Sequence, residues 1–300
     1  MQVLNQVIVL FLLMAVGYFA AKKRILDREA FAGINKLVLF FTLPCLTFAK
    51  LQQDAAPGQM GELMETLFIA IISILITGAA AYPIFKRQSP ERRAVFVHMA
   101  MFSNSGFMGY PLIMASLGAG KMIYAVMYVA AFNFLAWTVG VYIYAGKAGL
   151  SLKQALLNPT LIAVLLGIAF FALSVRIPKV PLDAMTMLGD TTTPLAMVVV
   201  GGRLSDLVPS DLKDKMLLLC CFLRLIVFPT AILGILTLLH VPQGAREAVF
   251  VCSAMPGATA TVMQAEHYHG DAALGSRSVA VSTALSVITI PVILLLLGLG

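Results

Sequence analysis

The strongest constraint in this sequence is a succession of apolar runs, each about as long as a membrane is thick. A helix needs about 20 mostly apolar residues to cross the hydrocarbon core of a bilayer. The mean hydropathy of the chain is +0.93, and only 12% of its 300 residues are charged. Soluble domains carry about twice that share of charge, so the composition excludes a soluble domain and indicates an integral membrane protein.

Ten apolar runs have the length or near-length of a membrane-spanning helix. We therefore expect an all-α integral membrane protein, with short loops and no room for a soluble domain. The ten transmembrane helices are expected at residues 3–21, 31–50, 64–85, 93–117, 122–145, 159–175, 191–207, 216–239, 247–267 and 273–297.

Basic residues are distributed unevenly between alternate loops. Loops that follow the odd-numbered helices hold 14 Lys and Arg, and the other loops hold 5. Because positive loops stay in the cytoplasm, we expect a multi-pass protein of the cell inner (plasma) membrane with both termini outside. The short basic clusters indicate contact with membrane lipid and exclude a nucleic-acid partner.

An internal repeat relates the two halves of the chain. Residues 92–101 read RRAVFVHMAM and residues 246–255 read REAVFVCSAM, with seven of ten positions identical. Each segment opens the fourth helix of a five-helix half, and five is odd, so the second half is inverted. We expect residues 1–150 and 151–300 to be two inverted five-helix repeats within one membrane domain, an arrangement typical of secondary transporters.

Glycine and proline interrupt the fourth and ninth helices at matching places. The interrupting residues are Gly106, Gly109, Pro111, Pro256 and Gly257. Pro111 is expected to push Tyr110 out of the α conformation. Inside a membrane, broken backbone is tolerated only where protein or a water-filled cavity satisfies it, so the paired breaks predict a binding site near the midplane. Two ordinary proline kinks are the alternative.

The residues around the two breaks indicate an anion. Two half-helices would begin just after the breaks, and a helix N-terminus attracts negative charge. No Asp or Glu occurs in residues 102–117 or 251–265, whereas a site for a cation would be expected to carry one. A carboxylate is the simplest ligand. We expect contacts from Asn104, Ser105, Gly106, Gly257, Ala258 and Thr259, with Thr261 as a further hydrogen-bonding side chain.

Three motifs resemble those of the auxin efflux carrier family: NSGFMGYPL (104–112), LGDTTTPLAM (188–197) and EHYHGD with VSTALSVITIP (266–291). The resemblance implies a fold with broken, crossing helices 4 and 9. It also implies transport of organic anions, which are auxin in plants and malate- or malonate-like acids in bacteria. By the same resemblance, Asn104 contacts the substrate carboxylate, Thr47 faces the substrate and Asn133 lines the site.

The resemblance implies one further feature, a homodimer, and a departure from the family bears on the energetics. A homodimer would form through the half that contains helices 2 and 7, where the Gly201-Gly202 pair lies. The charged pair that the plant carriers have in helix 3 is missing from residues 66–85. Net export driven by the membrane potential is therefore our first expectation for the energetics.

Arg224 and Gln264 are candidates for an ion or charge role. Arg224 could snorkel to the membrane surface, pair with Asp190 or Asp206, or attract the anion. Neutral oxygens of Asn104, Thr259 and Gln264 could instead bind sodium, so a sodium- or proton-coupled symporter or antiporter is the alternative function. His98 is either a packing residue or a proton carrier.

Enzymatic, cofactor and metal functions find little support in the sequence. The motifs GxSxG and HExxH are absent, and Ser105 has no base at a suitable spacing. The four cysteines lie in apolar runs, and the two histidines of residues 266–271 fit a solvated turn better than a metal site. A receptor that binds the anion without moving it is a further alternative to a carrier.

Overall fold

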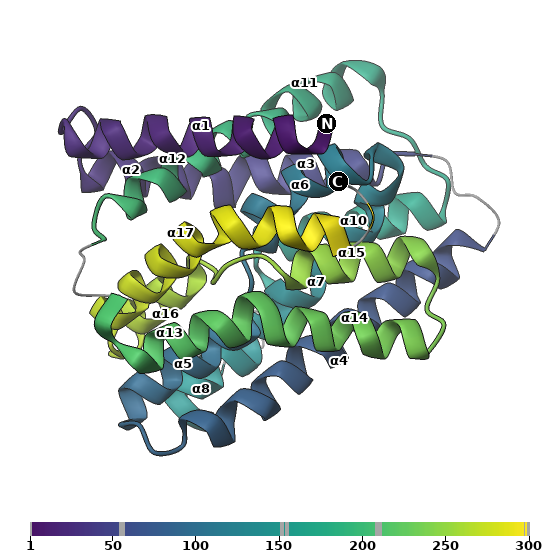
Figure 1. Cartoon of the computed structure of the whole chain (residues 1–300). Helices are drawn as coiled ribbons and strands as arrows, with labels where there is room; N and C mark the ends of the chain where they lie inside the picture. Colours follow the sequence, from purple (N-terminus) through teal and green to yellow (C-terminus); the bar gives the residue numbers. More distant parts are fainter. Residues whose placement is uncertain are drawn as a thin grey trace.

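Helices run through most of the chain (Figure 1). The computed structural model describes residues 2–53, 58–150, 153, 156–207, 212–296 and 298. Within these ranges the expected all-helical class is confirmed, since their only β feature is one isolated bridge. The longest uninterrupted helices are α1 (Gln2–Lys22), α4 (Gln59–Phe85) and α17 (Ala272–Leu296).

The remaining helices are shorter, and several follow one another without a loop. They are α2 (Arg28–Leu37), η1 (Val38–Thr42), α3 (Leu43–Lys50), α5 (Pro90–Met101), η2 (Ser105–Gly109), α6 (Tyr110–Ser116), η3 (Ala119–Lys121), α7 (Met122–Leu135), η4 (Ala136–Gly140), α8 (Val141–Ala145), η5 (Gly146–Gly149), α10 (Pro159–Ala172), α11 (Lys179–Asp190), α12 (Thr192–Leu204), α13 (Lys215–Phe222), η7 (Leu223–Val227), α14 (Phe228–Leu238), α15 (Gln243–Ser253) and α16 (Ala260–His267).

Helix occupies each of the ten ranges expected from hydropathy. Among the described residues, five helical stretches are long and apolar enough to cross a membrane: Arg28–Lys50, Gln59–Phe85, Ala119–Gly149, Lys215–Leu238 and Ala272–Leu294. The fourth and ninth ranges fall outside this set because a break divides each of them into two shorter pieces. The largest difference is at the start of the seventh range. The helix was expected to begin at residue 191, but helical structure already begins at Lys179 with α11, and α12 follows after Thr191.

Wide π-helical turns precede three prolines. The segments η1, η2 and η7 end two residues before Pro44, Pro111 and Pro229, which then lie in the first turn of an α-helix. Proline has no N–H and collides with the carbonyl four residues earlier, and a π-turn bonds five residues back instead. Tyr110 consequently keeps α geometry, with φ −57° and ψ −53°, so the expected distortion at Tyr110 is wrong.

The helices form two groups that face each other (Figure 1). Helices α1, α2, α3, α10, α11 and α12 pack together in one group, and helices α4 to α8 pack with α13 to α17 in the other. The first group contains the opening two helical stretches of each half of the chain. It therefore combines equivalent parts of the first and second halves.

Glycines bring α1 and α12 into backbone contact. A Cβ atom on Gly17 would lie 2.0 Å from the carbonyl oxygen of Val198, and one on Gly201 would lie 1.9 Å from that of Met14. A Cβ on Gly202 would meet the ring of Phe31 at 2.6 Å. Both glycines of the Gly201-Gly202 pair are thus used inside the chain, so the pair gives no support to a dimer interface.

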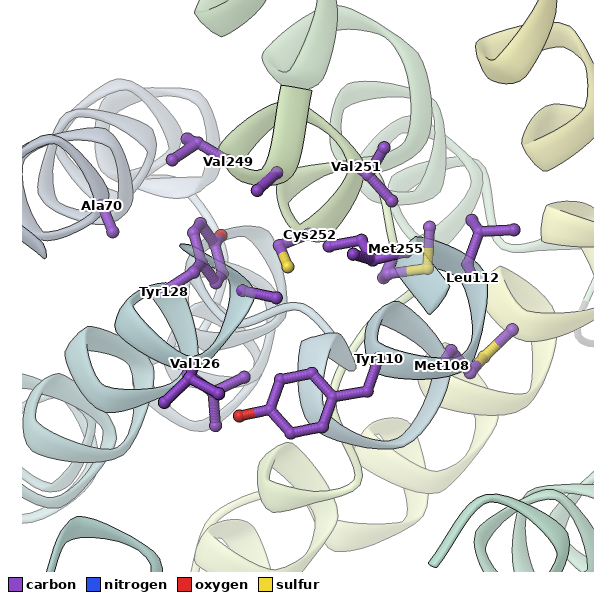
Figure 2. Packing of buried hydrophobic residues seen from close by; sticks show 14 of the residues in the cluster. Ala70, Met108, Tyr110, Leu112, Val126, Tyr128, Val249, Val251, Cys252 and Met255 are labelled. Carbon is purple, nitrogen blue, oxygen red and sulfur yellow. The ribbon is translucent and has the colours of Figure 1, made fainter. Parts of the chain in front are cut away.

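Helix α7 runs through the middle of the second group and is buried on nearly all sides. Figure 2 shows the packing around it, where Tyr128 of α7 lies near Cys252 of α15 and Tyr110 of α6. Each of these three side chains is at most 1% exposed. This core surrounds the breaks in the fourth and ninth helical ranges and holds them in place.

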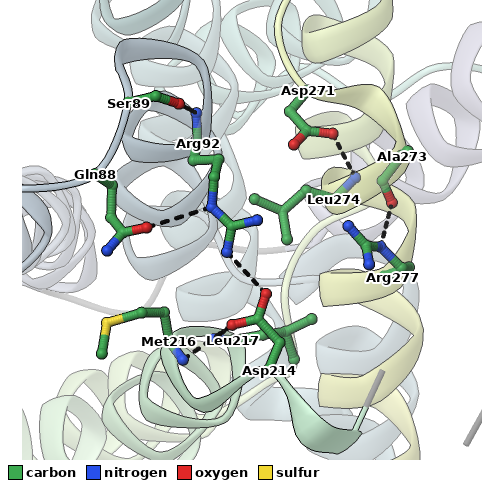
Figure 3. A network of polar contacts seen from close by, with 10 residues as sticks. All are labelled: Gln88, Ser89, Arg92, Asp214, Met216, Leu217, Asp271, Ala273, Leu274 and Arg277. Atoms are coloured by element: carbon green, nitrogen blue, oxygen red, sulfur yellow. Dashed lines mark hydrogen bonds and ion pairs between the residues drawn. The ribbon is translucent and has the colours of Figure 1, made fainter. Parts of the chain in front are cut away.

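Polar caps gather at the end of the molecule where α5, α13 and α17 begin (Figure 3). Ser89, Asp214 and Asp271 accept hydrogen bonds from first-turn amides of these helices, and Arg92 Nη2 lies 2.8 Å from Asp214 Oδ2. Burial alone would raise the pKa of Asp214, but hydrogen bonds from Arg92 and the capped amides outweigh it and lower that pKa. Helix α1 begins and α17 ends at the opposite end (Figure 1).

Candidate substrate-binding site

The first interrupted helix breaks earlier than its glycines and proline suggest. Helix α5 ends at Met101, and Phe102 is extended, with φ −105° and ψ 107°. The backbone resumes helical geometry at Ser105, so Gly109 and Pro111 lie in the second half-helix and do not form the break. A Cβ on Gly109 would make only ordinary contact, at 3.4 Å from Cys252 Sγ.

The second interruption lies where the sequence predicts it. Helix α15 ends at Ser253, and α16 begins at Ala260, so Pro256 and Gly257 fall within the break. Space is tight there, since a Cβ on Gly257 would lie 2.9 Å from Met99 Cγ and would force the Met99 side chain to shift.

The two breaks lie against each other and satisfy each other's backbone. Ser103 and Gly257 form an antiparallel bridge. The amide of Asn104 donates to Pro256 O at 2.8 Å, and the amide of Ala258 donates to Phe102 O at 2.9 Å. The hydroxyl of Ser282 on α17 accepts from the Gly257 amide at 3.1 Å. Broken backbone is therefore paired within the protein, as a membrane interior requires.

A cavity of about 70 Å³ adjoins this meeting point, where η2 and α16 begin. First-turn amides have no acceptor within their own helix, and they carry the positive end of its dipole. Among the eight residues expected to contact the substrate, five line this cavity: Asn104, Gly106, Asn133, Ala258 and Thr259.

Asn104 is the polar side chain best placed to bind a ligand there. It is 5% exposed, and within the described structure its Nδ2 has no hydrogen-bond partner. Asn133 Nδ2, in contrast, already donates to Val129 O at 2.8 Å. The unpaired amide of Asn104 can donate to an anion without breaking an existing bond.

Three expected contacts lie away from the cavity. Thr47 is completely buried on α3 beside Tyr110, Ser105 is 1% exposed, and Gly257 is covered by Met99 and Ser282. Thr261 is also occupied elsewhere, because its hydroxyl lies 2.9 Å from His98 Nδ1. His98 is completely buried, and its ring packs against Phe102.

The sequence did not indicate Arg203 and Asn35, which also line the cavity. Arg203 lies in the last turn of α12 and is the only charged residue among the described lining residues. The one signal that could have marked it is that Pro194 is followed by Arg203-Leu204 as Pro44 is followed by Lys50-Leu51, at nine residues instead of six. An isolated guanidinium at the cavity favours an anionic ligand.

A larger cavity of about 310 Å³ lies among α1, α3, α6 and α11. The charged residues of its described lining, Lys50 and Asp190, have opposite signs, so these two charges do not select for an anion or a cation. The smaller cavity at the breaks differs in that its described lining combines polar side chains with a single positive charge, Arg203.

Gln264 and Arg224 lie outside the smaller cavity. Gln264 Nε2 donates to Ala136 O at 2.7 Å. Arg224 is 1% exposed, and its guanidinium bonds to backbone carbonyls. In the described chain it pairs with neither Asp190 nor Asp206; the nearest cation to Asp206 is Arg28, at 3.7 Å.

Comparison with known proteins identifies the family of this chain. The sequence profile described as "Membrane transport protein" matches residues 2–153 and again residues 148–294. The chain belongs to this membrane transport protein family. The resemblance to the auxin efflux carriers is thereby confirmed, and the protein is a multi-pass membrane transporter from a family of transporters rather than enzymes.

The sequence similarity to relatives in this family covers almost the whole chain. An uncharacterized transporter of Methanocaldococcus jannaschii is 26% identical over 299 residues, which cover 96% of each protein. An uncharacterized transporter of Methanothermobacter thermautotrophicus is 28% identical over 298 residues, or 95% of each. The uncharacterized transporter YfdV of Escherichia coli is 21% identical, over 94% of this chain and 93% of its own.

Proposed function

We propose that this transporter is an efflux-type secondary carrier of small organic anions, foremost carboxylates. The observation that carries the proposal is the cavity at the two breaks. Asn104 and Arg203 line it, and no Asp or Glu is among its described lining residues. A carboxylate would accept from Asn104 Nδ2 and lie near the positive ends of η2 and α16, although the amides of Ser105, Thr261 and Val262 already donate to backbone carbonyls. Hydrogen bonds to a charged group contribute about 1.5–3 kcal/mol each.

The proposed architecture is ten transmembrane helices in two inverted five-helix repeats, residues 1–150 and 151–300. Two successive matches to one family profile support it. The group that contains α1, α3, α10 and α12 would be the scaffold, and the group with the crossing, interrupted helices would move. Rocking of one group against the other exposes a fixed site to each side in turn.

The proposed orientation places the start of α1 and the end of α17 on the outer side of the inner membrane. The uneven distribution of basic residues supports it, and the start of α1 and the end of α17 lie on one side of the described structure (Figure 1). A homodimer through the scaffold group remains part of the proposal on family grounds.

The function is tested with proteoliposomes that are loaded with candidate mono- and dicarboxylates. A potential of 100 mV favours outward movement of one negative charge by about 2.3 kcal/mol, or roughly a 50-fold gradient at equilibrium. We expect efflux to follow a valinomycin-imposed potassium potential when there is no sodium or pH gradient. Flux that ignores the potential and follows a sodium or proton gradient would instead establish ion-coupled transport. Binding without any flux would indicate a receptor.

Neutralising Arg203 should weaken anion binding without unfolding the protein. Its side chain is half-buried at the end of α12, and loss of a charge near the anion should cost about 1 kcal/mol, or about fivefold in affinity. We expect this loss for Arg203→Gln in a titration with the preferred carboxylate, and little loss for Arg203→Lys. Arg28→Gln is the matched control, because the Arg28 side chain is 93% exposed. Equal affinities for Arg203→Gln and Arg28→Gln would remove Arg203 from the site.

A further inference from the structure

The proposed binding site makes no use of Arg224, although this residue lies in the same core. Arg224 belongs to η7, and its side chain is 1% exposed. No carboxylate pairs with it in the described part of the chain. A buried, unpaired charge is strongly unfavourable, so its retention here requires partners of another kind.

Those partners are three carbonyl oxygens at the ends of the two interrupted helices. Arg224 Nη1 donates to Ala100 O of α5 at 2.9 Å, and Nη2 donates to Ser253 O of α15 at 2.5 Å. Its Nε donates to Met255 O, in the second break, at 3.1 Å. One planar guanidinium therefore joins the C-terminal ends of both half-helices, which its several fixed donors make possible.

The breaks themselves leave these carbonyls without their helical partners. In an unbroken helix, Ala100 O would accept from the amide of Asn104, four residues later. That amide donates to Pro256 O instead. The amide of Gly257, which would serve Ser253 O, donates to Ser282 Oγ. The two helix breaks thus leave carbonyl oxygens unpaired, and Arg224 donates hydrogen bonds to them.

The ends of two helices at one point make a site for positive charge. The C-terminus of a helix carries a partial negative charge, and transporters with discontinuous helices use such ends and unwound carbonyls to coordinate a mobile cation. We propose that Arg224 is a tethered cation in this position, which holds the two half-helices together and takes the place of a mobile ion. It is a positioning residue for the anion site.

A short chain of contacts connects Arg224 to the anion cavity. The hydroxyl of Tyr128 lies beside the guanidinium and 3.4 Å from Ser103 Oγ. Ser103 lines the cavity next to Asn104. The fixed charge of Arg224 therefore holds the backbone next to the cavity in position through Tyr128 and Ser103. This part of the inference rests on the proposed function.

The test measures thermal unfolding of purified protein in chloride salts of choline, sodium or guanidinium at low millimolar concentration. Removal of a buried, bonded charge should lower the unfolding midpoint of Arg224→Ala by about 10 °C. We expect guanidinium to restore most of that loss, sodium to restore part of it and choline none. Wild-type protein should unfold at the same temperature in all three salts.

Two further variants keep the test decisive if Arg224→Ala does not fold. Arg224→Lys retains the charge, and Arg224→Met retains only comparable bulk, so the Lys variant should unfold at a higher temperature than the Met variant. A rescue that depends on the identity of the cation is not expected of a residue that serves packing alone.

Two results would overturn the inference: an Arg224→Ala variant that responds to no cation, with equal stability of the Lys and Met variants, or a wild-type protein that sodium stabilises over choline. These measurements need no transported anion, so they are independent of the proposed function. Cation rescue combined with unchanged anion binding in Asn104→Ala would preserve this inference and reject the proposed site.

Discussion

Replacement of Asn104 by alanine should weaken binding of the transported anion at least tenfold. The side chain is 5% exposed at the cavity, and its Nδ2 has no partner within the described structure. In the complex, that donor would face a carboxylate, and a lost hydrogen bond to a charged group costs about 1.5–3 kcal/mol. Titration of the purified variant with the preferred carboxylate measures the effect.

The same substitution should leave the fold intact. The structural bonds of Asn104 come from its backbone, which donates to Pro256 O and accepts from the amides of Met108 and Gly109. Alanine retains all of them, so the unfolding temperature should change little. Asn5→Ala, at an exposed position of α1, is the control for removal of an amide side chain. Wild-type affinity in Asn104→Ala would show that the anion binds elsewhere.

The sequence predicted the second break more accurately than the first. Pro256 and Gly257 disrupt a helix by their own chemistry, so the position of that break could be read locally. The first break lies at Phe102 and Ser103, which have no such property. It forms there because Pro256 O and the Ala258 amide offer hydrogen bonds to that part of the backbone. This is a tertiary cause, and a single helix gives no sign of it.

The partners of Arg224 were also outside the reach of sequence analysis. A search for partners of a buried cation turns to Asp and Glu, whereas here the acceptors are the carbonyls of Ala100, Ser253 and Met255. Every residue has a carbonyl, so the sequence does not mark the ones that a helix break leaves free. Arg203 was missed for a related reason, since a cation at a helix end is also typical of an ordinary loop.

Of the five expected contacts that line the cavity, Asn104, Gly106, Ala258 and Thr259 could be read from the sequence because helix breaks concentrate polar backbone and small residues. Asn133, on α7, was expected from the family resemblance instead. Thr47 was expected only from the family resemblance, and its complete burial beside Tyr110 separates it from the cavity in this conformation. The alternating-access proposal predicts that such residues become accessible when the two helix groups move. The burial of Thr47 therefore describes this conformation only. Its contact with the substrate in the alternative conformation stays a prediction.

The second large effect is expected from Gly201→Ala, which should lower the unfolding temperature by about 5–10 °C through overpacking. The new Cβ would lie 1.9 Å from the backbone carbonyl oxygen of Met14. A side chain could rotate away, but a helix backbone cannot, so α1 and α12 must separate. Gly17→Ala should act alike, because its Cβ would meet Val198 O at 2.0 Å. Thermal unfolding in detergent measures both.

A double variant distinguishes helix separation from a general cost of replacing glycine. Once one substitution has moved α1 from α12, the second meets less resistance, so Gly17→Ala with Gly201→Ala should cost less than the sum of the two. Gly234→Ala on α14 is the matched control, since nothing lies within 4 Å of its added Cβ. Alanine favours a helix over glycine by up to about 1 kcal/mol, so this control should be neutral or stabilising. Equal losses in Gly201→Ala and Gly234→Ala would contradict close packing of α1 on α12, and with it the rigid scaffold against which the interrupted helices are proposed to move.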